Sequence, residues 1–289
     1  MKKKLIVVIV FYDQPEDTID CVKAVLRSDY SPLNVLLVDN GSSLESNRKI
    51  RAAFPEIPII RLEQNSGFVG GFNYGIQEAL EAGATDVFLL SNDAIIEPTT
   101  IRALDEADWD VSVPKILFYD HPELVQTAGA RWRTFPPSVI MIGFRSKDGP
   151  EFNLPRRLEY AIGCAFLARR RVLEQVGGFD PDFQNYSEDY DFFYRVNQAG
   201  FKIGLVPEAR LYHKDSLTTG KDPKRRRWFL GRNTVLFYRK GNRFPGWQLW
   251  SFMAWLILRE ALKLNFSHLP DYVKGFRDGY RYLRSKDSR

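Results

Sequence analysis

Three apolar segments of strand type each end in polar side chains that could bind a ligand. Because the carboxyl ends of parallel strands meet in one crevice of an open α/β sheet, these side chains are expected to lie together. A carboxylate there could accept hydrogen bonds from a base or a ribose, or hold a divalent metal on a diphosphate. Three unrelated polar turns are the alternative. The residues are Tyr12 and Asp13 after segment 5–11, Asp39 after 35–38, and Asn92 and Asp93 after 86–90.

Another group of acids, Glu188, Asp189 and Asp191, lies at the start of a predicted helix over residues 188–199. Negative charge is favourable at a helix start, so these acids could simply stabilise the helix with Ser187 as its N-cap. A positioned carboxylate could instead take the proton of a hydroxyl nucleophile, which is weak at neutral pH. The sequence leaves both explanations open.

Two further features could contribute polar contacts. His213 ends a predicted strand over residues 209–213 and could be structural or could bind a metal or phosphate. Residues 67–75 are predicted to form a glycine loop in which backbone approaches a ligand or a neighbouring element closely. The loop has neither the dinucleotide pattern nor the lysine of a P-loop, and Phe68 makes a solvated linker an unfavourable alternative.

Composition bounds the class of protein. The chain has 289 residues, 44% of them hydrophobic and 27% charged, which is typical of a folded protein with a sizeable core. Its net charge of +5 favours an anionic partner. Two cysteines fit neither a disulfide framework nor a metal cluster, so a reducing compartment is expected. The short apolar segment after the basic start predicts a buried strand rather than a signal peptide, and we expect no spanning helix.

Strands and helices alternate along the first 110 residues, which predicts a doubly wound, mostly parallel α/β sheet. Beyond residue 110, strands without intervening helices are expected, followed by a strand, two helices and two short strands. The predicted strands cover residues 5–11, 35–38, 57–62, 86–90, 111–119, 125–132, 138–144, 161–168, 202–206 and 209–213. The predicted helices cover residues 16–26, 48–54, 170–176 and 188–199, with another after the glycine loop and a start near Pro98.

Residues 221–289 form a predicted helical extension that is basic and rich in tryptophan. Basic residues beside an apolar aromatic helix suit binding to an anionic lipid surface. Packing against the core or against a second subunit in a homodimer is the alternative. Arg232 and Asn233 could also reach a diphosphate of the donor or acceptor.

Taken in order, these motifs resemble the inverting family 2 glycosyltransferases with the GT-A fold, and most of all a rhamnosyltransferase-like branch. The resemblance covers most of the first 215 residues. It rests on Tyr12-Asp13, Asp39-Asn40-Gly41-Ser42, Asn65-Ser66-Gly67-Phe68, Gly70-Gly71, Asn73, Gly75, Ser91-Asn92-Asp93, Gly163-Cys164-Ala165, Gly177-Gly178-Phe179-Asp180, Glu188-Asp189, Asp191 and His213.

The resemblance implies which parts of the chain bind the nucleotide, the metal and the acceptor. A GT-A catalytic domain would span residues 1–220, with a nucleotide-binding part to about 110 and an acceptor-binding part beyond it. Asp39 would bind the base, Asp93 and His213 would bind Mg²⁺ or Mn²⁺, and Asp189 beside Glu188 would be the catalytic base. Asp191 could contact the diphosphate or the acceptor, as could Arg232, which lies beyond the part that the resemblance covers. The remaining nucleotide-sugar contacts would be Tyr12, Asp13, Asn65, Gly67, Gly71, Asn73 and Asn92.

It also implies partners and a place of action. The donor would be a dTDP-, UDP- or GDP-sugar, and the acceptor a glycan or a polyprenyl-diphosphate-linked sugar in cell-surface polysaccharide synthesis. The enzyme would be cytoplasmic and peripheral at the inner face of the membrane. Two positions depart from the family pattern: Ser91 replaces an acid, which predicts modest metal affinity, and Asp13 replaces a common asparagine.

Two other functions were weighed. A nucleotidyltransferase acting on sugar phosphates shares metal and diphosphate chemistry, but a glycine-rich basic loop would then follow the first strand, where Asp13-Gln14-Pro15-Glu16 stands. A nucleic-acid-binding module would explain the basic extension and leave the acidic crevice unexplained. We therefore expect no nucleic-acid partner.

Overall fold

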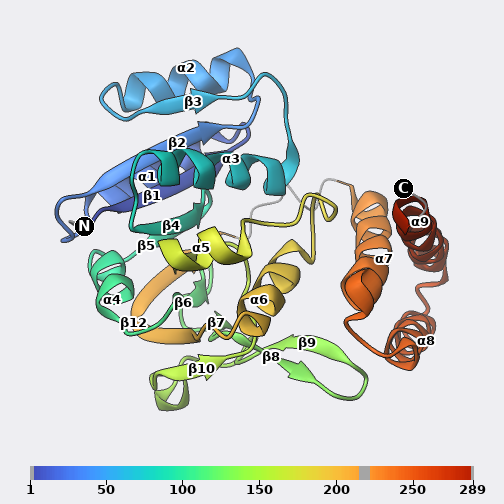
Figure 1. The fold of residues 1–289 in the computed structure, drawn as a ribbon. Helices are drawn as coiled ribbons and strands as arrows, with labels where there is room; N and C mark the ends of the chain where they lie inside the picture. Colours follow the sequence, from blue (N-terminus) through green and yellow to red (C-terminus); the bar gives the residue numbers. More distant parts are fainter. Residues whose placement is uncertain (1–2, 215–221, 288–289) are drawn as a thin grey trace.

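The computed structural model describes residues 3–214 and 222–287. Lys221, the first residue of the predicted extension, lies outside these ranges. A central sheet covered by helices forms the larger part, and three C-terminal helices stand beside it (Figure 1). The predicted α/β class with a helical extension is therefore confirmed.

The N-terminal half is a parallel sheet whose middle strand is buried throughout. Side chains of β1 alternate between two apolar layers, one with α3 and one with α1, which explains why the strand is apolar on both faces. The elements are β1 Leu5–Phe11, α1 Pro15–Leu26, β2 Asn34–Asp39, α2 Leu44–Ala53, β3 Ile59–Arg61, α3 Gly67–Glu81 and β4 Asp86–Ser91.

The register brings the polar strand ends to one edge. Phe11 pairs with Asp39 on β2, and Val10 pairs with Ser91 on β4, so three strands finish at the same level. Parallel pairing therefore places the segments that follow these strands side by side, as the sequence predicts.

The second half of the sheet mixes strand directions. The strand order is β10-β12-β6-β11-β4-β1-β2-β3, with β5 on β12 and β7 on β6, and β8 pairs with β9 in a separate hairpin. The elements are β5 Ala94–Ile96, α4 Thr100–Glu106, β6 Val111–Phe118, β7 Val125–Thr127, β8 Ala130–Arg133, β9 Ser138–Met141, η1 Pro150–Phe152, β10 Arg156–Leu158, β11 Ala165–Arg169, α5 Arg170–Val176, α6 Glu188–Gln198 and β12 Ile203–His213.

Three local predictions are wrong. The glycine loop is the first half of α3, because its glycines let the helix lie directly on β1 and β2; a Cβ on Gly71 would be 2.6 Å from Val10 Cγ1. The two short strands near the end are one strand, β12, with an irregularity between Val206 and Arg210. The single strand predicted over residues 125–132 is two strands, β7 paired with β6 and β8 paired with β9. The helix expected to start near Pro98 does begin there, at Thr100, after the short strand β5.

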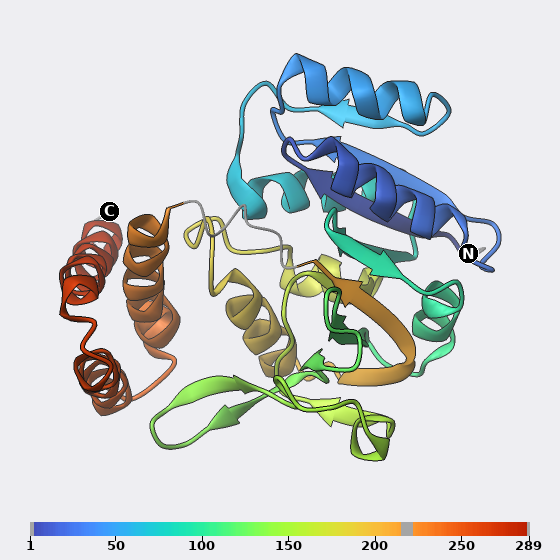
Figure 2. The ribbon, with the colours of Figure 1, turned by 180° about the vertical axis from the view of Figure 1, so that it is seen from behind.

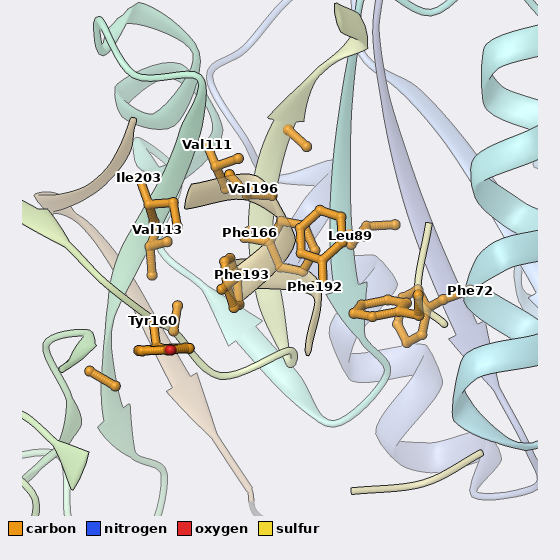
Figure 3. Packing of buried hydrophobic residues seen from close by; sticks show 14 of the residues in the cluster. Phe72, Leu89, Val111, Val113, Tyr160, Phe166, Phe192, Phe193, Val196 and Ile203 are labelled. Atoms are coloured by element: carbon orange, nitrogen blue, oxygen red, sulfur yellow. The ribbon is translucent and has the colours of Figure 1, made fainter. Parts of the chain in front are cut away.

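Phenylalanines fill the core between the sheet and α6. Figure 3 shows Phe166 on β11 against Phe192 and Phe193 of α6, with ring centroids 5.2 and 5.1 Å apart. Phe72 of α3 joins the same cluster, so the glycine helix and the helix that begins at Glu188 share one core.

The extension consists of α7 Pro223–Arg239, η2 Lys240–Asn242, α8 Gly246–Leu262, η3 Phe266–His268 and α9 Leu269–Asp287. Both ribbon views place α7 between α9 and the segment that precedes α6 (Figures 1 and 2). Glycines bring α7 and α9 into backbone contact: a Cβ on Gly231 would lie 2.5 Å from the Tyr272 carbonyl oxygen. In the described residues, no helix is long and apolar enough to cross a bilayer.

Candidate active site

Asp39 lies fully buried at the end of β2. Its carboxylate accepts hydrogen bonds from the Ser42 amide at 2.8 Å and the Asn47 side chain at 2.5 Å. Arg61 of β3 adds an ion pair at 2.8 Å. These contacts fix the carboxylate at the edge where a nucleotide base is expected, and Arg61 is a partner that the sequence motifs did not indicate.

The segment after β1 is tied to the segment after β2. Asp13 has a left-handed backbone, with φ of 53°, and its amide donates to Ser42 Oγ at 2.8 Å. Its carboxylate accepts from the Ser43 amide at 2.9 Å. Asp13 therefore bonds to the segment after β2, and Tyr12 beside it is 40% exposed.

Asn40 organises the start of α3. Its side-chain nitrogen donates to the Gly67 carbonyl at 2.9 Å, and its oxygen accepts from the Ser66 amide at 3.0 Å. Asn65 in turn accepts from the Gly67 amide at 2.8 Å. Three residues that are predicted to contact the nucleotide sugar thus lie beside the end of β2: Asn65, Gly67 and Gly71.

Asn73 has a different setting. Its amide nitrogen donates to the Phe179 carbonyl at 2.7 Å, and its oxygen accepts from the Phe179 amide at 2.8 Å. This two-way contact holds α3 against the segment after α5, which is a structural role. Its predicted contact with the donor stays a prediction.

The structure brings Asp93 and His213 together. Because β12 pairs with β5, His213 Nε2 lies 3.3 Å from Asp93 Oδ1. Gln126 lies on the other side of the ring, 3.0 Å from Nδ1. When Nδ1 donates to Gln126, Nε2 presents a lone pair to the carboxylate, and a cation or proton between the two suits this arrangement. Asn92 points elsewhere and donates to Thr18 at 3.0 Å.

This pair is small for a metal centre. Among residues 3–214 and 222–287 there is no group of three histidine, cysteine or acidic side chains that could hold an ion. A hard cation at Asp93 and His213 would need further oxygen ligands, which a diphosphate and water can supply.

Asp189 lies in the first turn of α6, with its carboxylate against a backbone amide. Its Oδ2 accepts from the Gly163 amide at 3.1 Å, and its Oδ1 accepts from the Tyr190 amide at 2.8 Å. Burial raises the pKa of Asp189 to about 6, against these hydrogen bonds, which lower it. A carboxyl group with a pKa near neutrality suits a general base.

Glu188 is buried beside Asp189. Burial raises its pKa well above the usual range, and the charge of Asp189 raises it further. Within the described part of the chain, Glu188 Oε2 is a buried oxygen with no hydrogen-bond partner. Ser187 has φ of 66° and no side-chain cap bond, so the alternative in which it caps α6 with its hydroxyl is wrong.

The two side chains predicted to contact diphosphate or acceptor are occupied elsewhere. Asp191 is fully buried between Arg195 at 2.8 Å and Arg243 at 2.6 Å. Arg232 donates to the Asp182 carbonyl at 2.8 Å and covers the ring of Tyr282. Both side chains join the extension to the rest of the protein.

Residues 6–177 match the family described as glycosyl transferase family 2. The chain belongs to glycosyl transferase family 2. It is therefore a glycosyltransferase and not the nucleotidyltransferase considered as its alternative.

Relatives of this family 2 glycosyltransferase extend over most of its length. It is 29% identical over 265 residues to an N-acetylglucosaminyl-diphospho-decaprenol L-rhamnosyltransferase of Mycobacterium tuberculosis, covering 82% of this chain and 83% of the relative. It is 22% identical to the low-salt glycan biosynthesis hexosyltransferase Agl10 of Haloferax volcanii, covering 100% and 95%. The expected relationship to rhamnosyltransferases is confirmed.

Solved structures share the fold at low identity. GalNAc-T7 with UDP, GalNAc and Mn²⁺ superposes with a TM-score of 0.59 at 19% identity, and the match covers 81% of this chain and half of that one. A mannosyltransferase from Pyrobaculum calidifontis in complex with GDP-Man and Mn²⁺ gives 0.57 at 14% identity, covering 95% and 84%. The GT-A fold of this glycosyltransferase is confirmed.

The sequence motifs gave no sign of two residues that hold the site in shape, and a third, Asn233, was expected to contact a diphosphate instead. Gln126 orients His213, Arg61 pairs with Asp39, and Asn233 binds the segment before Glu188. None of the three follows a strand as the recognised motifs do. A lone arginine or amide gives no signal of its own until the fold shows what it contacts.

Proposed function

We propose that this glycosyltransferase moves a sugar from a nucleotide-diphosphate sugar to a hydroxyl group of a glycan or polyprenyl-diphosphate-linked acceptor, with inversion at the anomeric carbon. One observation carries the proposal. Asp189 bonds to the Gly163 amide, and the next carbonyl, that of Cys164, accepts from the Ser91 amide at 2.8 Å. The candidate base therefore adjoins the strand end that carries Asp93.

In the proposed reaction, Asp189 accepts the proton of the acceptor hydroxyl as its oxygen bonds to the anomeric carbon. The bond from that carbon to the diphosphate breaks on the opposite face, and the nucleoside diphosphate leaves. Burial keeps the Asp189 carboxylate poorly solvated, which makes it a stronger base. No covalent enzyme intermediate is required.

Asp93 and His213 fit a divalent cation, because a carboxylate and a ring nitrogen face each other at 3.3 Å. We propose that these two side chains hold Mg²⁺ or Mn²⁺, which when bound neutralises the diphosphate leaving group. The solved relatives that carry Mn²⁺ with UDP or GDP-Man support this assignment. The relative named as an N-acetylglucosaminyl-diphospho-decaprenol L-rhamnosyltransferase supports a rhamnosyl donor and a polyprenyl-diphosphate-linked acceptor. We propose that the donor is a dTDP-, UDP- or GDP-linked sugar and that the enzyme acts in polysaccharide synthesis.

A screen of sugar nucleotides tests this function. Hydrolysis and transfer are measured for dTDP-, UDP- and GDP-sugars with Mg²⁺, with Mn²⁺ and with chelator. We expect one donor class to be used, activity to need the metal, and Asp189→Asn to lose about 10²- to 10⁴-fold in transfer while it still binds nucleotide. Full transfer by Asp189→Asn, or a product that retains the donor's anomeric configuration, would count against the mechanism.

The extension supports action at a lipid surface. Residues 222–287 hold fifteen Lys and Arg against five Asp and Glu, whereas the whole chain holds 41 against 36. The outer face of α8 is apolar, and Leu262 on this face is 76% exposed. The one acid of α8, Glu260, is buried and pairs with Arg259. We propose that this face meets anionic lipid at the inner surface of the membrane. The face is formed by Trp247, Trp250, Leu258 and Leu262.

Vesicle flotation separates lipid binding from self-association. The intact protein is mixed with vesicles of neutral or anionic lipid, and the double variant Leu258→Glu, Leu262→Glu is compared with Leu154→Glu, a 63% exposed leucine outside the extension. We expect the double variant alone to lose flotation with anionic vesicles. A change in oligomeric state of the double variant, with flotation intact, would indicate a second subunit on this face instead.

A further inference from the structure

The loop before the candidate base has an unfavourable backbone that something must hold. Gln184, Tyr186 and Ser187 have φ of 61°, 63° and 66°. Side chains other than glycine rarely adopt this left-handed region, and such residues persist only where surrounding structure enforces them. Glu188 and Asp189 follow directly, so whatever holds this loop also sets the start of α6.

Asn233 of α7 fixes this loop in place. The side chain is fully buried, and its nitrogen donates to the carbonyl oxygens of Phe183 at 2.8 Å, Asn185 at 2.6 Å and Tyr186 at 2.7 Å. The two N–H groups of this amide are therefore shared among three backbone carbonyls of a single loop, one of them in a bifurcated bond. Its own oxygen accepts from Arg232 at 2.7 Å, which fixes the orientation of the amide.

Charged groups of the extension anchor the same loop one step earlier in the chain. Lys240 pairs with Asp180 and with Asp182, the latter at 2.6 Å. Lys286 of α9 pairs with Asp182 at 2.7 Å, and Tyr282 donates to it at 2.6 Å. These contacts hold the pKa of Asp182 well below its usual range.

The opposite side of the loop contacts the predicted nucleotide-binding part of the protein. Asn185 accepts from the Phe68 amide at 3.3 Å, and the Gln184 carbonyl accepts from the Val69 amide at 3.4 Å. Both amides belong to the first turn of α3. The loop is therefore held from the extension on one side and contacts the predicted nucleotide segment on the other.

We propose that Asn233 is a positioning residue for glycosyl transfer: it holds residues 183–187 so that Asp189 is presented to the acceptor hydroxyl. This inference rests on the proposed role of Asp189. It gives the extension a part in catalysis that is separate from any contact with lipid.

The substitution Asn233→Asp tests whether this side chain fixes the loop. It keeps the shape of the side chain and replaces the donating nitrogen by an oxygen that repels the three carbonyl oxygens. Amide hydrogen exchange and steady-state transfer are measured on the full chain. We expect faster exchange over residues 183–189 and a kcat about ten- to hundredfold lower, as small misplacements of catalytic groups cause. The nucleotide KM is expected to stay within about twofold, and the acidic limb of the pH profile to shift.

Thr234→Ala is the matched control, because the hydroxyl of this neighbour bonds to the Leu230 carbonyl within α7 and to no other group of the described residues. It is expected to leave both exchange in the loop and kcat unchanged. If Asn233→Asp does not fold, Lys240→Met removes the partly exposed anchor on Asp180 and Asp182 and should give a smaller change of the same kind.

Two results would overturn the inference: exchange over residues 183–189 that does not change, or faster exchange with an unchanged kcat. Failure of the proposed function looks different. Full transfer by Asp189→Asn would remove the base assignment, while the exchange measurement still reports directly whether Asn233 holds the loop.

Discussion

Two parts of the crevice, the Asp39 carboxylate and the loop before Asp189, are held in place by contacts of different range. The hydrogen-bond partners of Asp39 lie 3, 8 and 22 residues away along the chain. The loop before Asp189 is bound by Asn233 from 47 to 50 residues away, and Lys286 reaches Asp182 across 104 residues. The Asp39 carboxylate is thus held by nearby sequence, and the loop before the base by distant sequence.

The difference matters for stability as well as for function. A site made from neighbouring residues forms once one strand-loop-helix unit folds, whereas the base loop needs the extension in place. The buried ion pairs of Asp191 with Arg195 and Arg243 lie at that junction. Substitutions in the two regions should therefore separate donor binding from transfer.

The largest expected effect on stability is at the junction. Asp191→Asn leaves Arg195 and Arg243 without their buried counter-ion, and removal of one partner from a buried pair costs about 3–5 kcal/mol. Urea unfolding, followed by fluorescence, measures the free energy of unfolding. Glu45→Gln, which breaks only an exposed pair with Lys49, should change it by less than about 0.5 kcal/mol. Equal effects of the two variants would show that the junction is not critical.

The next largest effect is on transfer at low pH. Burial raises the pKa of Asp189 to about 6, and a base acts only when unprotonated, so transfer should be complete above this pH and fall below it. At two pH units below, about a hundredfold loss of kcat is expected. Nucleotide affinity is measured at the same pH values as a test of the nucleotide-binding residues. If affinity falls in step with kcat, the loss of kcat does not come from protonation of the base.

The sequence predicted the donor edge because its residues follow strands directly. The apolar segments before Asp39 and Asp93 identify buried parallel strands, and parallel strands bring their ends together without further information. His213 also ends a strand, but β12 pairs antiparallel with β5, so its place beside Asp93 follows from the folded sheet and not from the rule for parallel strands. The family and the GT-A class came from the resemblance of the ordered motifs to family 2 glycosyltransferases, and the helical extension from the character of residues 221–289.

Other features of the fold and the site could not be predicted from the sequence. The glycines of residues 67–75 suggested a loop, but their reason is the close approach of α3 to β1 and β2, which exists only after folding. Asp191 and Arg232 looked like ligands for substrate because they are charged residues near motifs. In the folded chain Asp191 pairs with two arginines and Arg232 meets a backbone carbonyl, contacts that span up to 52 residues of sequence.

The last comparison takes one glycine from each region. A Cβ on Gly71 of α3 would lie 2.6 Å from the Val10 side chain, whereas one on Gly231 of α7 would lie 2.5 Å from the Tyr272 carbonyl oxygen. A side chain can turn aside and a helix backbone cannot, so Gly231→Ala should cost about 3 kcal/mol and Gly71→Ala about 1 kcal/mol. Thermal unfolding measures both.

The same pair should separate the two functions. Gly71→Ala disturbs Asn40, which is 3.2 Å from the added carbon, and is expected to weaken nucleotide binding. Gly231→Ala shifts α7 next to Asn233 and is expected to lower kcat with nucleotide affinity retained. If Gly231→Ala weakened nucleotide binding as much as it lowered kcat, the extension would support the whole crevice rather than the base loop, and the contrast between the two regions would not hold.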